Sequence, residues 1–198
     1  MYPSQPALTL FDPLGALLGW GEGEFTYTFA QVVALTGHGC PTTAGAFLLT
    51  CRAVELLYGQ DMPQRGDLRI TLPGGREEGV LGVMGQVFTL LTGAAGSEGF
   101  KGLAGQMARD NLLIFAPGSA VPGKGGFLFQ RLSTGAAVRL GYAPGAIPAA
   151  PTLGADMQQV LSGQADAATR RRFTQAWHQR VLDILEDAGQ STVSRLAE

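Results

Sequence analysis

Hydrophobic residues recur at every third or fourth position in two stretches of the chain, which is the spacing of one face of an α-helix. The first stretch follows Pro41 and contains Ala44, Phe47, Leu48, Cys51 and Val54. The second lies near the end of the chain and contains Phe173, Ala176, Trp177, Val181 and Ile184. The spacing predicts a helix that starts at residue 41 and buries one face, and an amphipathic terminal helix.

Capping residues predict a shorter helix before the first of these stretches. Thr28 and Gln31 have the spacing of a capping box, in which each side chain bonds the backbone at the other residue. Gly37 can adopt the left-handed conformation that ends many helices. Pro41 is favoured at the first position of a helix, so the next helix starts there with Cys40 at or beside its N-cap.

Strict alternation of hydrophobic and polar residues predicts a half-buried strand over residues 67–72. Residues 111–115, 126–131 and 136–142 also have the composition of strands. Ser133, Thr134 and Gly135 separate the last two and predict a turn, so these two strands form a hairpin.

Residues 80–91 are apolar, and their length favours a helix over a strand. The acidic pair Glu77 and Glu78 in front of them supports this interpretation, because anions stabilise a helix N-terminus. The glycine-rich residues 92–105 predict a loop, and their spacing does not match a phosphate-binding motif.

The order of these elements predicts an α+β fold, with N-terminal helices packed on a mainly antiparallel sheet and an amphipathic helix at the C-terminal end. We expect an N-terminal arm of turns over residues 1–27 and an α+β core over residues 28–146. Residues 147–198 are expected to form a proline-rich linker and a helical extension.

Composition favours a well-buried globular protein, because 45% of the 198 residues are hydrophobic and 15% are charged. The net charge of −2 gives no basic excess for nucleic acid, and we interpret the short run Arg170–Arg172 as a solvated helix face. The N-terminal residues do not resemble a signal peptide, and no apolar run reaches the ~18 residues of a membrane span. We therefore expect a soluble, cytoplasmic protein without a membrane partner.

The candidate chemistry lies in TGHGCPTTAGAF, residues 36–47, which contains one of two histidines and one of two cysteines, His38 and Cys40. Free amide groups at a helix N-terminus favour the thiolate form of a cysteine such as Cys40. A thiolate and an imidazole together are good donors for Zn²⁺. Three interpretations stay open from spacing alone: a structural turn, a metal-binding pair, and a nucleophilic Cys40 with His38 as its base.

The other cysteine and the other histidine are expected to lie apart from this pair. If Cys40 and Cys51 bracket one helix, their Cα atoms are about 16 Å apart, too far for a disulfide. Both are then free thiols, as in a reducing compartment. We interpret His178 as a residue on the flank of the terminal helix and not as a metal ligand.

TGHGCPTTAGAF resembles the signature that opens a helix in the FmdE family of formylmethanofuran dehydrogenase subunits, with His38, Cys40 and Pro41 in the matching places. Three later segments resemble this family's second helix, its following strand and its hairpin, in the same order: VMGQVFTLLTG, RDNLLIF and KGGFLFQRLSTGAAVRL. The resemblance covers about residues 28–142. It implies an α+β core, a homodimer, and a transition-metal site on His38 and Cys40, with zinc as the favoured metal.

The chain also departs from the family pattern. Many members have His where Thr36 stands, Gly where Thr42 stands, and Cys and Asp where Val83 and Gln86 stand. The cysteine-rich C-terminal zinc finger of some members has no counterpart here. The metal shell must therefore be completed by water, a small-molecule ligand or cofactor, a partner subunit or Gln86. An accessory or scaffold subunit with a vestigial site is a further alternative, and whether the chain is an enzyme stays open.

Overall fold

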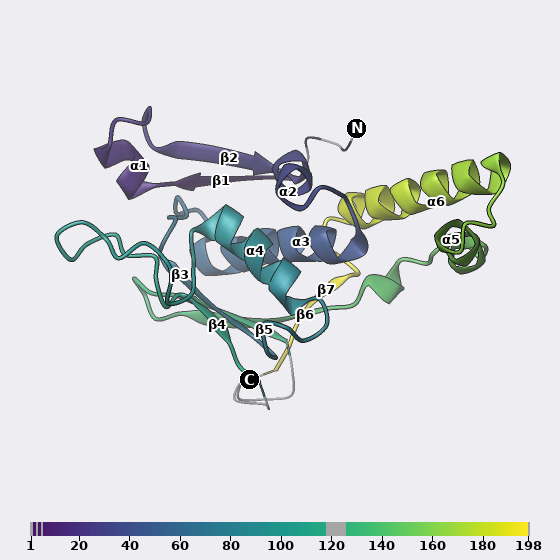
Figure 1. The fold of residues 1–198 in the computed structure, drawn as a ribbon. Helices are drawn as coiled ribbons and strands as arrows, with labels where there is room; N and C mark the ends of the chain where they lie inside the picture. Colours follow the sequence, from purple (N-terminus) through teal and green to yellow (C-terminus); the bar gives the residue numbers. More distant parts are fainter. Residues whose placement is uncertain (1, 3, 5, 118–125, 198) are drawn as a thin grey trace.

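The computed structural model describes residues 2, 4, 6–117 and 126–197. It has an α+β fold, as the sequence predicts. Figure 1 shows three layers: a β-hairpin, a middle layer that contains α3 and α4, and a five-stranded sheet. The helix α3 contacts α4 and the strands β5, β6 and β7, so it lies at the centre of the molecule.

The sheet has the strand order β4-β3-β5-β6-β7. Its strands are β3 (Leu68–Leu72), β4 (Leu113–Phe115), β5 (Phe127–Arg131), β6 (Ala137–Tyr142) and β7 (Val193–Arg195). Neighbouring strands are antiparallel except β3 and β4, which are parallel. The alternation predicted for β3 is confirmed, since Leu68, Ile70 and Leu72 are buried. The FmdE-like hairpin segment corresponds to β5 and β6, although its residues 124 and 125 lie outside the described residues.

The helices of the middle layer are α2 (Phe29–Thr36), α3 (Pro41–Tyr58) and α4 (Leu81–Thr92). The helices α2 and α3 begin where their capping residues predict, and α4 lies where the apolar residues 80–91 predict a helix. Thr28 and Gln31 form the capping box, and Gly37 ends α2 in the left-handed conformation. Cys40 is the N-cap of α3 and Pro41 is its first residue.

The first half of α3 is buried on every side, whereas its sequence predicts one buried face. All residues from Thr43 to Thr50 are buried. A helix enclosed on all sides needs small residues, and Ala44, Gly45 and Ala46 provide them. The enclosure follows from the layers, because the sheet covers one side of α3 and other elements cover the rest.

The N-terminal residues form a hairpin, so the expectation of an arm of turns was wrong. The strands β1 (Ala7–Phe11) and β2 (Glu24–Thr28) are antiparallel, and the short helix α1 (Pro13–Leu17) follows β1. Leu8 and Leu10 alternate with less buried residues and reach the core. The prolines and glycines that suggested an arm lie mainly in the segments around these short strands.

The C-terminal part contains the predicted amphipathic helix, α6 (Ala167–Glu186), together with two elements that the sequence did not predict. These are α5 (Leu153–Leu161) and β7, and the short 3₁₀ turn η1 (Pro144–Ala146) precedes α5. The helices α5 and α6 pack against each other and project from the core (Figure 1). Arg172, from the basic run, donates hydrogen bonds to Asp156 of α5.

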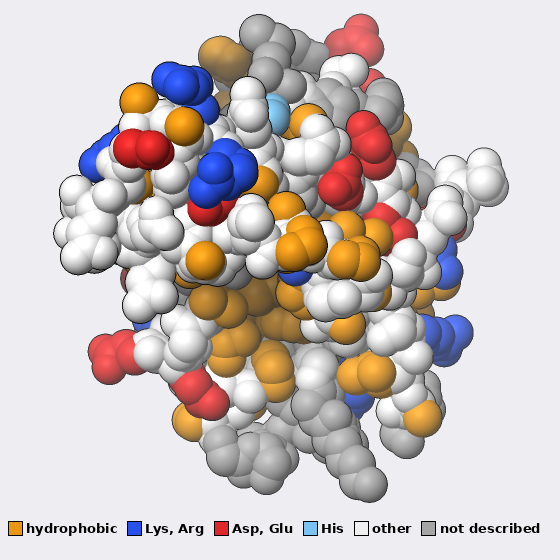
Figure 2. Space-filling view, turned by 90° about the vertical axis from the view of Figure 1, so that its right-hand side faces the viewer, with side chains coloured by type: hydrophobic (Ala, Val, Ile, Leu, Met, Phe, Trp, Pro, Cys, Tyr) orange, Lys and Arg blue, Asp and Glu red, His pale blue; other side chains and the backbone are white. Residues whose placement is uncertain are grey.

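The face that carries this helical pair is hollowed near its centre, and hydrophobic side chains gather in the hollow (Figure 2). In the described part of the chain, no helix combines the length and the apolar character needed to cross a membrane.

A buried ion-pair network joins the N-terminal hairpin to the middle layer. Asp12 Oδ1 accepts from Arg109 Nη2 at 2.7 Å, and Asp12 Oδ2 accepts from Arg65 Nε at 3.0 Å. Arg65 Nη1 also donates to the carbonyl oxygens of Leu90 and Leu91, at 2.6 Å and 2.7 Å. The carboxylate of Asp12 therefore binds the guanidinium groups of Arg65 and Arg109, which belong to different segments of the core.

The environment of Asp12 stabilises its charged form. Burial alone would raise the pKa of this carboxyl group, but hydrogen bonds from the Gly15 amide and Arg109, and the charges of Arg109 and Arg65, lower it below its ordinary value. The stabilisation is thus present above the pKa of the unfolded chain, near ~4, and is lost as the pH falls through the lower folded-state pKa.

Replacing Asp12 by Asn should lower the free energy of unfolding by about 3–5 kcal/mol at pH 7, because it leaves the buried guanidinium of Arg109 and the half-buried one of Arg65 without their carboxylate. Equilibrium unfolding in urea measures the change. The matched control is Glu55→Gln, which breaks the exposed 2.6 Å pair with Arg52 and should cost less than about 1 kcal/mol. Equal losses in the two variants, or a difference between wild type and Asp12→Asn that persists at low pH, would contradict the assignment.

Candidate site at the start of helix α3

The candidate site lies in the short connection between α2 and α3, and the connection itself orients its histidine. His38 is exposed, and its Nδ1 lies 2.9 Å from the carbonyl oxygen of Thr36. Because a carbonyl oxygen only accepts, Nδ1 is the donor in this contact, so Nε2 is the nitrogen that a metal could bind in the neutral ring. The Thr36 hydroxyl donates to the His38 carbonyl oxygen at 2.9 Å, which holds the same turn from its other side.

Cys40 is half-buried and exchanges hydrogen bonds with the first turn of α3. Its backbone N–H donates to the Thr43 hydroxyl at 3.0 Å, and this hydroxyl lies 3.6 Å from the Cys40 sulfur, at which it can donate. The sulfur stands at the N-terminus of an 18-residue helix, where backbone dipoles favour negative charge. The first turn of α3 therefore holds the Cys40 side chain at the start of the helix.

Two aromatic donors from distant parts of the chain hold the carbonyl groups on either side of Cys40. Trp177 Nε1 in α6 donates to the Gly39 oxygen at 2.9 Å. The Tyr142 hydroxyl in β6 donates to the Pro41 oxygen at 2.6 Å. These bonds fix the start of α3 against both the sheet and the terminal helix. Sequence reasoning placed Trp177 on the buried face of its helix but had no signal for either bond, because the partners are more than 100 residues apart.

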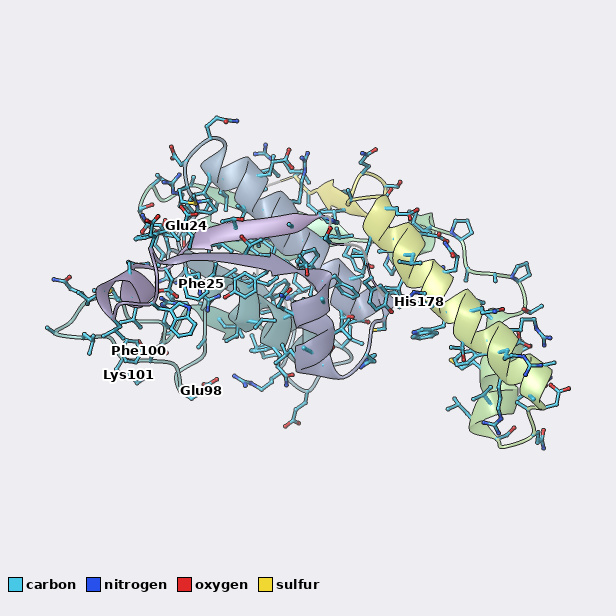
Figure 3. All side chains as sticks on the ribbon, turned by 90° about the horizontal axis from the view of Figure 1, so that it is seen from above. Glu24, Phe25, Glu98, Phe100, Lys101 and His178 are labelled. Carbon is cyan, nitrogen blue, oxygen red and sulfur yellow. The ribbon has the colours of Figure 1, made fainter. Side chains whose placement is uncertain are left out.

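A third aromatic residue, Tyr2, packs directly on the connection. A side-chain carbon at residue 39 would overlap the end of the Tyr2 ring, so the ring packs here against a residue that has no side chain. The Tyr2 ring also lies edge-on to Phe29, with centroids 4.9 Å apart, and 4.7 Å from the ring of His178. Figure 3 shows His178 on the flank of α6 that faces α2 and the core. His178 therefore lies near the site, and its ring contact there is with Tyr2.

Cys40 is one of the groups that raise the pKa of the phenols of Tyr2 and Tyr142. Burial raises the pKa of Tyr142, and the charge of Cys40 raises it further, although Arg180 opposes the change. Burial and Cys40 also raise the pKa of Tyr2. Both hydroxyl groups therefore stay protonated at neutral pH, and that of Tyr142 donates to the Pro41 oxygen.

The other residues suggested by the FmdE resemblance lie elsewhere. Val83, on α4, is 38% exposed. Gln86 lines a cavity of about 380 Å³ whose described lining includes Leu35 and Phe115 but neither His38 nor Cys40. The structure thus assigns Gln86 to a separate cavity and does not bring it together with the His38–Cys40 pair.

The donor chemistry of the pair suits two positions of a zinc shell. Nε2 of His38 and Sγ of Cys40 are ligand types that Zn²⁺ prefers, and a tetrahedral site needs four donors. Within the described residues, no group of three or more His, Cys, Asp or Glu side chains is close enough to hold a metal ion. Any further ligand of the metal would therefore have to be another kind of group, such as water, a small molecule or a residue of a partner subunit.

The same geometry bears on a nucleophilic role for Cys40. An activated cysteine forms a hydrogen bond with its base. In the part of the chain that the structure describes, the hydrogen bond at the Cys40 sulfur comes from Thr43, and His38 is held by Thr36. Among the described residues, the structure therefore gives each of the two side chains its own local partner and no hydrogen bond that joins them.

Comparison with known proteins assigns no family to the chain: no protein-family model matches it, and neither does any curated protein.

Alkylation should distinguish the two cysteines, which are both free thiols as expected. Burial raises the pKa of Cys51 to about 12, so at pH 8 this thiol stays protonated and unreactive. Iodoacetamide at pH 8 should label Cys40 in the native protein, and Cys51 only after denaturation in guanidinium chloride. Peptide mapping by mass spectrometry measures both sites. Labelling of native Cys51 at the rate of Cys40 would contradict this assignment.

Proposed function

We propose that this chain is an FmdE-like metal-binding protein in which His38 and Cys40 hold a divalent transition metal ion, with Zn²⁺ as the favoured metal. The two protein donors leave coordination positions open for water, a small-molecule ligand or a partner subunit. When bound, the metal would act as a Lewis acid toward a ligand in an open position.

The observation that carries the proposal is the orientation of the His38 ring. Metal-binding histidines almost always donate their second ring N–H to a carbonyl or carboxylate group, which fixes the tautomer and directs the other nitrogen at the metal. The 2.9 Å contact between His38 Nδ1 and the Thr36 oxygen is this type of contact. Cys40, two residues later, supports the proposal because its sulfur is a ligand type that Zn²⁺ prefers and stands at the start of α3.

Metal content measured by elemental mass spectrometry tests the proposal. The full-length wild-type protein, loaded with Zn²⁺ and desalted, should retain the metal. Cys40→Ser and His38→Ala should each lower the zinc affinity by about tenfold or more, because each removes one of two protein ligands. Cys51→Ser and His178→Ala are the matched controls, and both should retain wild-type metal content.

Equal metal content in the wild type and in Cys40→Ser would refute the metal site. No retained metal in any variant, with an unchanged fold by circular dichroism, would instead favour a scaffold with a vestigial site.

We further propose that the chain forms a homodimer, with an interface on the outer side of α4. Support comes from exposed hydrophobic residues there, with Val80 49% and Val83 38% exposed, next to Leu35 at 44%. Burying such residues against a second copy removes apolar surface from water.

Light scattering after size exclusion should give twice the chain mass of 20.7 kDa. Val83→Glu should shift the protein toward the monomer, because the charge would be buried in the interface. Leu161→Glu, at a 79% exposed position of α5, is the control and should leave the mass unchanged. A monomeric wild-type protein would exclude the dimer, and a dimeric Val83→Glu variant would exclude this interface.

A further inference from the structure

The cavity that Gln86 lines has mainly aliphatic walls and is separate from the His38–Cys40 pair. Its volume of about 380 Å³ lies within the ~300–1,000 Å³ typical of small-molecule sites. Apolar side chains come from the end of α2, from α4 and from β4, and they are those of Leu35, Leu90 and Leu113. The packing of these elements therefore forms the cavity.

Close contact between α4 and β4 holds the apolar walls in place. A side-chain carbon at Gly85 would lie 2.8 Å from the Phe115 ring, so the helix backbone approaches the strand directly at this residue. Gly85 and Phe115 both line the cavity. The apolar part of the cavity is thus built on a helix and a strand and not on a loop.

The charged residues of the described lining are one cation and one anion, Arg76 and Glu98. Arg76 follows β3, and Glu98 lies on the loop that follows α4 (Figure 3). Arg76 Nη2 donates to Glu98 Oε1 at 3.4 Å, which is longer than the usual ~2.7–3.2 Å. Both side chains are more than half exposed, so this ion pair is weak. The two charges cancel where they line the cavity.

Arg76 and Gln86 have hydrogen-bonding groups to spare beside the cavity. The Arg76 guanidinium lies over the Phe115 ring, 4.9 Å from its centroid, which keeps it against the wall. Among the described residues, Glu98 is its hydrogen-bond partner, and the side-chain amide of Gln86 has none. Because a guanidinium carries five N–H donors, most of those on Arg76 can bind a ligand.

We propose that this cavity is a binding site for a small aliphatic molecule with an uncharged head group that both accepts and donates hydrogen bonds, such as a primary carboxamide. The carbonyl oxygen of the head would accept from Arg76, its N–H would donate to Glu98, and the aliphatic chain would lie along the leucine walls. A carboxylate head would be repelled by Glu98 and an ammonium head by Arg76. The proposal goes beyond the metal site, because the described lining includes neither His38 nor Cys40.

The test compares octanamide, octanoate and octylamine, which have chains of the same length and differ in the head group. NMR titration of the full-length protein at pH 7 measures their dissociation constants. Octanamide should bind in a saturable manner and about threefold or more tighter than either charged ligand, because a charged head loses its water and meets a like charge.

Removing one charge of the pair should change this preference in a defined direction. Glu98→Gln should favour octanoate over octanamide, and Arg76→Gln should favour octylamine over octanamide. Both positions are exposed, so both variants should keep the fold. Glu55→Gln, in the exposed Arg52–Glu55 pair of α3, is the matched control and should keep the wild-type preference for octanamide.

No saturable binding of any of the three ligands would overturn the site. Tighter binding of octanoate or octylamine to the wild type would overturn the uncharged head group. An unchanged preference in Glu98→Gln or in Arg76→Gln would place the ligand outside this cavity and overturn the assignment.

Leu35 is shared with the proposed dimer interface, but the cavity is lined by one chain. Octanamide should therefore leave the mass measured by light scattering unchanged, and a changed mass would overturn the assignment to a single chain. Zinc retention enters none of these measurements, so a failure of the metal site is detected separately.

Discussion

The hydrogen bonds from Trp177 and Tyr142 to the carbonyl groups on either side of Cys40 are the constraint on which the site depends. Pro41 and the Thr36 and Thr43 hydroxyls define the local shape of this segment, but they do not attach it to the rest of the molecule. The two aromatic donors provide that attachment from β6 and α6. These bonds fix a connection of a few residues to the sheet and to the terminal helix. Within the connection, Thr43 contacts the Cys40 sulfur and Thr36 orients the His38 ring.

A second constraint operates between the layers. The helix α3 is enclosed along its first half, so its partners on both sides have to be fixed relative to one another. Asp12 connects the hairpin with Arg65 and Arg109, and Arg65 in turn bonds carbonyl groups near the end of α4. Carbonyl groups at a helix C-terminus lack internal partners, and a cation there also suits the helix dipole. One carboxylate thus links the hairpin to a helix that packs against α3.

The features that the sequence predicted are those with local causes. The capping box at Thr28, the left-handed Gly37 and the proline start at residue 41 each depend on neighbouring residues, and the structure confirms them. The N-terminal hairpin, α5 and β7 were missed because their strands or helices are short and are stabilised by contacts with distant segments. The candidate site divides in the same way. The position of Cys40 at the N-cap follows from Pro41, whereas the contributions of Tyr2, Tyr142 and Trp177 arise only when residues far apart in the chain are brought together.

The arrangement of the sheet has a consequence for the behaviour of the protein at high concentration. The strands at its two edges, β4 and β7, are each three residues long. An edge strand offers unpaired backbone groups to another chain, and a short edge offers few of them. The longer strands β3, β5 and β6, with their hydrophobic alternation, lie inside the sheet and are paired on both sides. The five-stranded sheet therefore keeps its longer strands away from intermolecular β-pairing for as long as its edge strands stay in place.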